Sequence, residues 1–102
     1  MDDNEEIVGI MKSRLDNFSS NGVEKLVQER LNIGRERYGH GVIVNKDTTE
    51  FGTKSNNWGE MMMEELLDGM VYACAEELRN GRSEKNDKIM YHLYKAIEIY
   101  IS

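Results

Sequence analysis

Apolar residues recur every three or four positions along most of the chain, which is the spacing of amphipathic helices. The longest such stretch runs from Trp58 to Arg79, and the whole chain contains no proline. Shorter stretches run from Asn4 to Phe18, from Val23 to Tyr38, and from Ser83 to about Ile101. In chain order, the apolar stripes expected to be buried are Ile7, Ile10, Met11, Leu15 and Phe18; Val23, Leu26, Val27, Leu31 and Ile33; Met61, Leu66, Met70, Ala73 and Leu78; and Ile89, Leu93, Ala96, Ile97 and Tyr100. The pattern therefore predicts an all-α protein of four helices.

Residues that cap or break helices stand between these stretches. Residues 19–22, Ser-Ser-Asn-Gly, interrupt the first two helices and offer N-cap candidates to the second. Gly39 ends the second helix, and Gly81 closes the third as a C-terminal glycine. Ser83, followed by acidic residues, starts the fourth. Each predicted helix thus has an identifiable beginning and end.

The chain from residue 39 to residue 57 is polar and irregular. Val42 to Val44 favours a brief strand, but no second run of similar strength is present to pair with it. Loops of this length are uncommon in small domains, and those that occur are often functional. At 102 residues the whole chain is expected to form a single domain.

Charge and composition exclude several classes of function. Thirteen basic and nineteen acidic residues give a net charge of −6, so a surface for duplex DNA or RNA is not expected. No apolar run approaches the roughly 20 residues of a membrane span, and no signal segment opens the chain, so we expect a soluble, cytoplasmic protein without membrane contact. The single cysteine, Cys74, is expected to be a small buried residue of the third helix.

Three carboxylates lie in the middle of the third helix. Glu64 and Asp68 are four residues apart and Glu65 and Asp68 are three apart, so all three can point toward one side. Apolar neighbours such as Leu67 predict that they are partly buried, where like charges are costly unless a cation lies among them. The cluster is consistent with a solvated acidic face, a site for a hard cation, or a general acid/base pair. Glu29 on the preceding helix can add a further oxygen ligand.

Two segments of the chain together resemble a known enzyme family. The sequence ERLNIGRERYG at 29–39 is followed by a loop, a tryptophan and EELLDGMVY at 64–72. This arrangement is similar to the MazG-like all-α nucleoside triphosphate pyrophosphohydrolases, in particular to the small single-domain forms encoded by phages, and the similarity covers roughly residues 23–79. It implies a four-helix bundle with a long loop between helices two and three, in the host cytoplasm. Apart from the resemblance, stripes rich in methionine and tyrosine favour a subunit interface, in a homodimer or homotetramer, over an ordinary intramolecular core. These residues are Met61, Met62, Met63, Met70, Tyr91 and Tyr94. The implied reaction is the hydrolysis of a (deoxy)nucleoside triphosphate, with a purine deoxynucleotide expected, to the monophosphate and pyrophosphate.

The resemblance also assigns metal ligands. The ExxD half of the family's metal motif matches Glu65 and Asp68, with Glu64 beside them. The EExxE half is kept only at Glu29, within Gln28-Glu29-Arg30-Leu31-Asn32. An alternative overlay uses Glu64, Glu65 and Asp68 as the first half and Glu84 with Asp87 as the second, although acids at a helix start are expected for dipole reasons alone. The implied cofactor is Mg²⁺, for which Mn²⁺ can substitute.

The remaining site residues follow from what phosphoanhydride hydrolysis requires, which is neutralised phosphate charge, an aligned water and a proton acceptor. The candidates are Glu64 and Glu29 for activating water, Arg30, Arg37 and Lys54 for phosphates, and Trp58, Tyr38 and Asn57 for the base. No phosphate-binding loop of the GxxxxGK type is present in the sequence, so triphosphate recognition is expected to depend on the metal.

Two other hypotheses stay open on the sequence. A helical module that dimerises and binds another protein would keep the helices and the acidic surface without a cation. A family member that binds nucleotide without hydrolysing it would explain the incomplete EExxE half.

Overall fold

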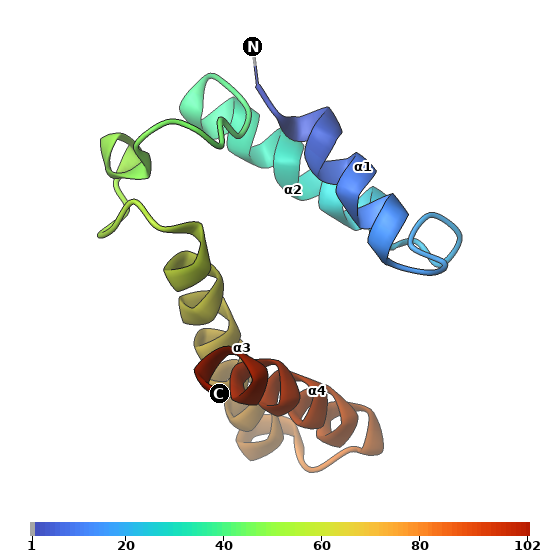
Figure 1. The fold of residues 1–102 in the computed structure, drawn as a ribbon. Coiled ribbons are helices and arrows are strands. Elements are labelled where there is room, and N and C mark those ends of the chain that lie inside the picture. Colours follow the sequence, from blue (N-terminus) through green and yellow to red (C-terminus); the bar gives the residue numbers. More distant parts are fainter. Residues whose placement is uncertain (1) are drawn as a thin grey trace. The chain divides into compact units, whose positions relative to one another are not determined.

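The computed structural model describes residues 2–102 and consists of helices joined by turns and loops (Figure 1). In chain order the elements are α1 (Asn4–Arg14), α2 (Val23–Tyr38), the 3₁₀ helix η1 (Thr48–Phe51), α3 (Trp58–Asn80) and α4 (Glu84–Ile101). No strand occurs among the described residues. The prediction of an all-α chain with four helices and a long connection between the second and third is confirmed. No helix within residues 2–102 has the combination of length and apolar character that a membrane span requires.

The residues group into two compact units, Met1–Phe51 and Gly52–Ser102. The first contains α1, α2 and η1, and the second contains α3 and α4. The single domain, the type of bundle and the oligomeric assembly stay predictions.

The helix ends agree with the capping residues in three of four helices. Gly39 ends α2 in the left-handed conformation and its amide donates to the Arg35 carbonyl, while the Gly81 amide donates to Glu77. The Ser83 side chain accepts a hydrogen bond from the Asn86 amide at the start of α4. These contacts satisfy backbone groups that the helix itself leaves unpaired.

The first helix is shorter than predicted. It ends at Arg14 rather than Phe18, because Leu15 adopts an extended conformation with φ −120° and ψ 119°. The turns that follow carry Phe18 inward, where only 3% of its surface is exposed. Val8 of α1, 6% exposed, is the other well-buried large side chain of this unit. An ion pair of 3.1 Å between Lys12 Nζ and Glu24 Oε2 links α1 to α2.

Residues 2–4 bind the first part of the long loop. The Asp3 amide donates to the Val42 carbonyl at 2.6 Å, and the Val42 amide donates to Asn4 Oδ1 at 2.8 Å. The Val44 amide donates to Asp3 Oδ2 at 2.7 Å, and Arg35 forms an ion pair of 2.9 Å with Asp2. The Val42–Val44 segment is therefore not a strand, because side chains of residues 2–4 take most of its hydrogen bonds.

Two glycines of this unit should respond in opposite directions to alanine. A Cβ on Gly41 would lie 2.5 Å from the Asp2 carboxylate and 2.7 Å from Asn4 Nδ2, so Gly41→Ala should lower the free energy of unfolding by about 1–3 kcal/mol. A Cβ on Gly34, inside α2, would meet nothing within 4 Å among the described residues. Gly34→Ala should therefore raise stability by about 0.5–1 kcal/mol through helix propensity. Denaturant titrations of both variants test this, and equal effects would contradict the packing around Gly41.

Asp2 should make this unit sensitive to acid. Its pKa is lowered from the ordinary value of 3.8, first by the hydrogen bond from the Asn4 amide and then by that from Arg35. A carboxyl group whose pKa is lower in the folded state stabilises the fold above its unfolded pKa, and this contribution is lost as the pH falls through the folded pKa. Asp2→Asn should therefore lower Tm at neutral pH and make less difference below pH 3.8. Asp16→Asn, at an exposed acid in the turns after α1, makes the same change in net charge and is the control.

In the second unit α3 and α4 form an antiparallel hairpin (Figure 1). The Asn86 side chain donates to the Ala73 carbonyl at 2.8 Å, and a Cβ on Gly69 would lie 3.6 Å from the methyl groups of Leu93. Gly69 therefore lies on the face of α3 that packs against α4, and a Cβ there would make an ordinary van der Waals contact with Leu93. Ala73, 7% exposed, is the most buried apolar residue of this unit among the described residues.

Many residues predicted to be buried are exposed instead. Leu78 is 88% exposed, and Cys74 is also on the surface, so both predictions of burial are wrong. The other members of the predicted stripes that lie exposed are Ile10, Leu15, Val23, Leu26, Ile33, Ile89 and Tyr100. These exposed apolar residues lie on both units, so each hairpin leaves apolar surface that nothing in its own unit covers.

Candidate functional site

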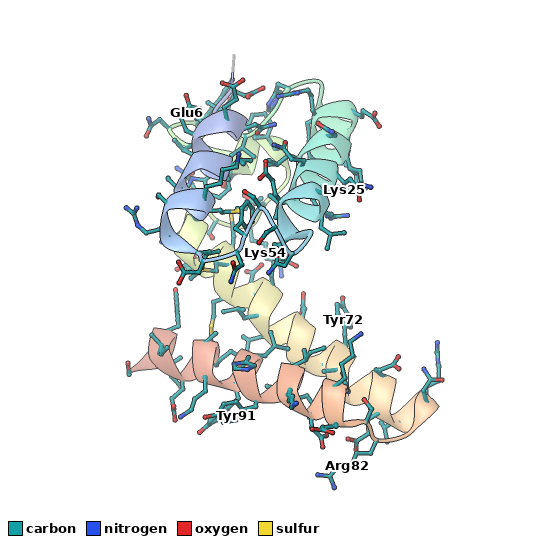
Figure 2. All side chains as sticks on the ribbon, turned by 90° about the vertical axis from the view of Figure 1, so that its right-hand side faces the viewer. Glu6, Lys25, Lys54, Tyr72, Arg82 and Tyr91 are labelled. Atoms are coloured by element: carbon teal, nitrogen blue, oxygen red, sulfur yellow. The ribbon has the colours of Figure 1, made fainter. Side chains whose placement is uncertain are left out.

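A hollow of about 460 Å³ lies at the beginning of α3 and is formed entirely by the second unit. Residues 52–55, just before the helix, form one wall, and Lys54 of this segment is labelled in Figure 2. The facing wall comes from the first turns of α3, namely Trp58, Met61, Met62, Glu64 and Glu65. Its volume falls within the range of roughly 300–1,000 Å³ that is usual for small-molecule sites.

Local sequence explains why these side chains meet. Asn57 caps α3, because its Oδ1 accepts a hydrogen bond of 2.9 Å from the Glu60 amide. The Thr53 hydroxyl donates to the Ser55 carbonyl at 2.9 Å, which folds the preceding segment into a turn. In α3 itself, residues 61, 62 and 65 lie three, four and seven positions after Trp58, so all four residues share one face of the helix.

The hollow combines an apolar wall with both signs of charge. Trp58, 44% exposed, lies with Met61 and Met62 on the apolar side, where the ring presents a surface on which a flat aromatic group can stack. Glu64 and Glu65 lie at the same hollow, and Lys54 is its only cation among the described lining residues. This arrangement suits a ligand that joins an aromatic ring to an anionic group, provided that the two carboxylates are neutralised.

The carboxylates are more exposed than expected. Glu64, Glu65 and Asp68 are all exposed, so the prediction of partial burial is wrong. They take part in none of the ion pairs found between residues 2 and 102. α3 meets α4 through the face that includes Gly69 and Ala73.

The donor chemistry suits magnesium, although no preformed cage is present. No group of three or more Asp, Glu, His or Cys side chains within residues 2–102 is arranged to hold a metal ion. Magnesium, however, is commonly held by one or two carboxylates together with waters and substrate phosphates rather than by an all-protein cage. Glu64 and Glu65 at the hollow supply such carboxylates, and Asp68 follows one helical turn later.

Four other predicted site residues lie on α2, in the first unit. Glu29, Arg30 and Arg37 are exposed there, and Arg30 borders a shallow apolar hollow of about 330 Å³ formed by α2 alone. Tyr38 is 52% exposed, with its ring centroid 6.5 Å from that of Phe51. The hollow at α3 thus brings together Lys54, Trp58, Glu64 and Glu65, while the assignments on α2 stay predictions.

In the structure, Asn57 and the acids of the alternative metal overlay, Glu84 and Asp87, already form contacts within the chain. Asn57 Oδ1 caps α3 by accepting a hydrogen bond from the Glu60 amide, so only its Nδ2 group would be left to contact a base. Glu84 and Asp87 already pair with cations, since Glu84 lies 3.2 Å from Lys88 Nζ and Asp87 lies 3.0 Å from Arg82 Nε. Both pairs lie on the surface, and the choice between the two metal overlays stays a prediction.

The sequence interpretation missed several lining residues, including Met62, Thr53 and Ser55. The spacing of Met62 four residues after Trp58 was a usable signal, because it places both on one helical face. Thr53 and Ser55 gave none, since the fold of a polar loop is not encoded in a periodic pattern. His40, which follows the glycine at the end of α2, packs on Phe51 with ring centroids 4.7 Å apart.

A second and larger hollow runs along α4 and has a different character. Its volume is about 760 Å³ and its floor is apolar, formed by Leu66, Ile89, Leu93 and Ala96, with Glu84, Lys85, Lys88 and His92 along the rim. It contains no member of the carboxylate cluster, and its shape is that of a groove between two helices. The smaller hollow at Trp58 is therefore the better candidate for chemistry.

In comparisons with protein-family models, curated protein sequences and solved structures, no match to this chain was found.

Proposed function

We propose that the chain is a magnesium-dependent pyrophosphohydrolase that converts a (deoxy)nucleoside triphosphate into the monophosphate and pyrophosphate. The observation that carries the proposal is the hollow at the start of α3, where a candidate base-stacking ring (Trp58), a candidate phosphate ligand (Lys54) and two candidate metal ligands (Glu64 and Glu65) line one cavity. The proposal also rests on the resemblance of residues 23–79 to MazG-like enzymes, from which the metal-ligand roles of Glu64 and Glu65 are taken.

Each residue of the hollow has a distinct role in this proposal. Trp58, with Met61 and Met62, holds the base by stacking, which is tolerant of base identity because every base has a π face. Lys54 pairs with phosphate oxygens as a point charge. Glu65, together with Asp68 one helical turn further along α3, would hold magnesium, and Glu64 would accept a hydrogen bond from the attacking water and then its proton. When bound, the metal would neutralise charge on the phosphate oxygens.

The direct test is to incubate the protein and magnesium with a panel of ribo- and deoxynucleoside triphosphates and to identify the products. We expect monophosphate and pyrophosphate in equal amounts, with purine deoxynucleotides preferred. Release of orthophosphate would show cleavage at another phosphoanhydride bond. If no product forms from any triphosphate, the hydrolase proposal is wrong, and the hypothesis that the chain binds nucleotide without hydrolysing it takes its place.

A self-associated state is the second part of the proposal. Leu67, Val71, Cys74 and Leu78 follow one another on α3 at spacings of four, three and four residues and are all exposed, so they form an unpartnered apolar stripe. We therefore infer that a second copy covers this stripe, in a homodimer or a homotetramer.

Sedimentation equilibrium tests the assembly. Wild-type protein should behave as a dimer or tetramer, and Val71→Asp should shift it toward the monomer because a buried unpaired carboxylate is costly. Glu76→Asp on the same helix is the control and should leave the mass unchanged. A monomeric wild-type protein at all accessible concentrations would exclude this part of the proposal.

One observation supports the rival hypothesis, a helical interaction module without catalysis. The exposure of Glu64, Glu65 and Asp68 is also what a solvated acidic face would show. The two hypotheses differ in their response to magnesium.

A further inference from the structure

Two asparagines in this chain precede glycine, Asn21 before Gly22 and Asn80 before Gly81. Such pairs are prone to spontaneous loss of the side-chain amide, because glycine has no side chain to hinder attack by its own backbone nitrogen on the asparagine Cγ. The two pairs have the same local sequence chemistry but lie in different surroundings. Their reactivity in the folded protein should therefore differ for structural reasons alone.

The pair at the end of α3 is held in an unreactive arrangement. Asn80 is the last residue of the helix, and its Nδ2 lies 3.0 Å from both carboxylate oxygens of Glu76. The Gly81 amide, which would have to attack, donates a hydrogen bond of 2.8 Å to the Glu77 carbonyl. A helical backbone at Asn80 also directs the following nitrogen away from its own side chain. Attack requires that the last turn of α3 first unfold locally.

The pair before α2 lacks these restraints. Asn21 lies in the turns between α1 and α2 and is exposed, and Gly22 adopts the left-handed conformation with φ 88°. Within the described residues no hydrogen bond from the Gly22 amide is present. Asn21 Oδ1 accepts a hydrogen bond of 3.2 Å from the Val23 amide, which polarises the carbonyl group and makes Cγ more electrophilic.

We propose that Asn21 is a site of spontaneous deamidation in the folded protein and that Asn80 is protected. The Gly22 nitrogen attacks Asn21 Cγ, a bond forms between them, and the Cγ–Nδ2 bond breaks. The proton lost by the Gly22 nitrogen balances the one gained by the departing amide, which leaves as ammonia. Water then opens the cyclic imide at either carbonyl, giving aspartate or isoaspartate, and no reagent other than water is consumed.

The position of Asn21 gives the modification a consequence for α2. The new carboxylate lies at the N-terminus of α2 beside the Val23 amide, where the helix dipole favours negative charge. At position 80 the same charge would lie at a helix C-terminus, next to Glu76. Asn21→Asp should accordingly keep or raise Tm, whereas Asn80→Asp should lower it. This inference does not depend on the proposed enzymatic function.

Peptide mapping by mass spectrometry tests the proposal. The full chain is held for days at 37 °C and mildly alkaline pH, both folded and in concentrated guanidinium chloride, and is then digested with a lysine-specific protease that separates residues 13–25 from residues 55–85. Folding should change the rate at Asn21 by less than about threefold but slow Asn80 by about tenfold or more, since opening of the helix end precedes reaction there. Equal slowing at the two sites, or faster reaction at Asn80 in the folded protein, would overturn the proposal. Asn21→Gln should remove the mass gain from the first peptide and leave the second unchanged.

Discussion

Asp68→Asn should abolish both the stabilisation of the protein by magnesium and most of its turnover. A site that binds the folded state alone adds about 2.7 kcal/mol when the ligand is a hundredfold above its Kd. For a domain of this size that corresponds to a rise in Tm of about 10–20 °C. The amide of asparagine is a far weaker ligand for a hard cation than a carboxylate, so the rise should disappear and kcat/KM for the triphosphate should fall by about 100-fold or more. Thermal unfolding with and without magnesium, and product assays, measure the two effects separately.

Without metal the same substitution should act in the opposite direction. Asp68 and Glu64 are like charges four residues apart on α3, and removal of one should raise the apo Tm slightly, by the equivalent of about 0.2–0.5 kcal/mol. Glu76→Gln, which removes one negative charge two turns later on the same helix, controls for the change in net charge and should retain the magnesium response. If wild-type protein and Asp68→Asn are equally indifferent to magnesium, the acidic cluster is a solvated surface and the interaction module is the better hypothesis.

Helix positions could be predicted from the sequence because both periodicity and capping are local properties. α2 was predicted with both of its bounds, and the chemistry of Gly39, Gly81 and Ser83 is that of helix ends in any context. The error at α1 has a tertiary cause. Phe18 continues the helical spacing, but it reaches its buried position from a turn.

Burial was predicted less well, because periodicity tells which face of a helix is apolar but not what covers it. The Leu67, Val71, Cys74 and Leu78 stripe lies on the surface, since α3 meets α4 through another face that includes Ala73. A chain that buries so few large side chains among its described residues is one whose apolar faces need further partners. That need is a property of the assembly, which a single sequence does not encode locally.

The candidate site was predicted in its helical half only. Glu64, Glu65 and Trp58 lie where the spacing along α3 places them, and all three line the hollow. Lys54 was chosen for its charge alone, and its position beside them results from the turn stabilised by the Thr53 hydroxyl. The sequence left a solvated acidic face open for these acids beside partial burial, because whether apolar neighbours shield them depends on how α4 lies against α3.

Phe18→Ala should cause the largest loss of stability of any single substitution considered for this chain. The side chain is 3% exposed and lies in the turns that join α1 to α2, so its removal leaves a cavity that turns cannot easily close. Phenylalanine-to-alanine changes in cores cost about 3–5 kcal/mol, which is a large part of the roughly 5–15 kcal/mol that stabilises a typical domain. Urea titration followed by circular dichroism should show a much lower midpoint, and the first unit should lose its helical signal first. A loss below about 1 kcal/mol would mean that Phe18 is not part of the core.

Leu78→Ala is the matched control, because it also removes a large apolar side chain, but one that is 88% exposed. In an isolated chain it should change the free energy of unfolding by no more than about 0.5 kcal/mol. If a second copy covers the stripe on α3, its cost should instead grow with protein concentration, because association and folding are then linked. The loss caused by Phe18→Ala arises within one chain and should persist at every concentration. The concentration dependence of the two variants therefore separates a core built by the chain itself from one completed by assembly.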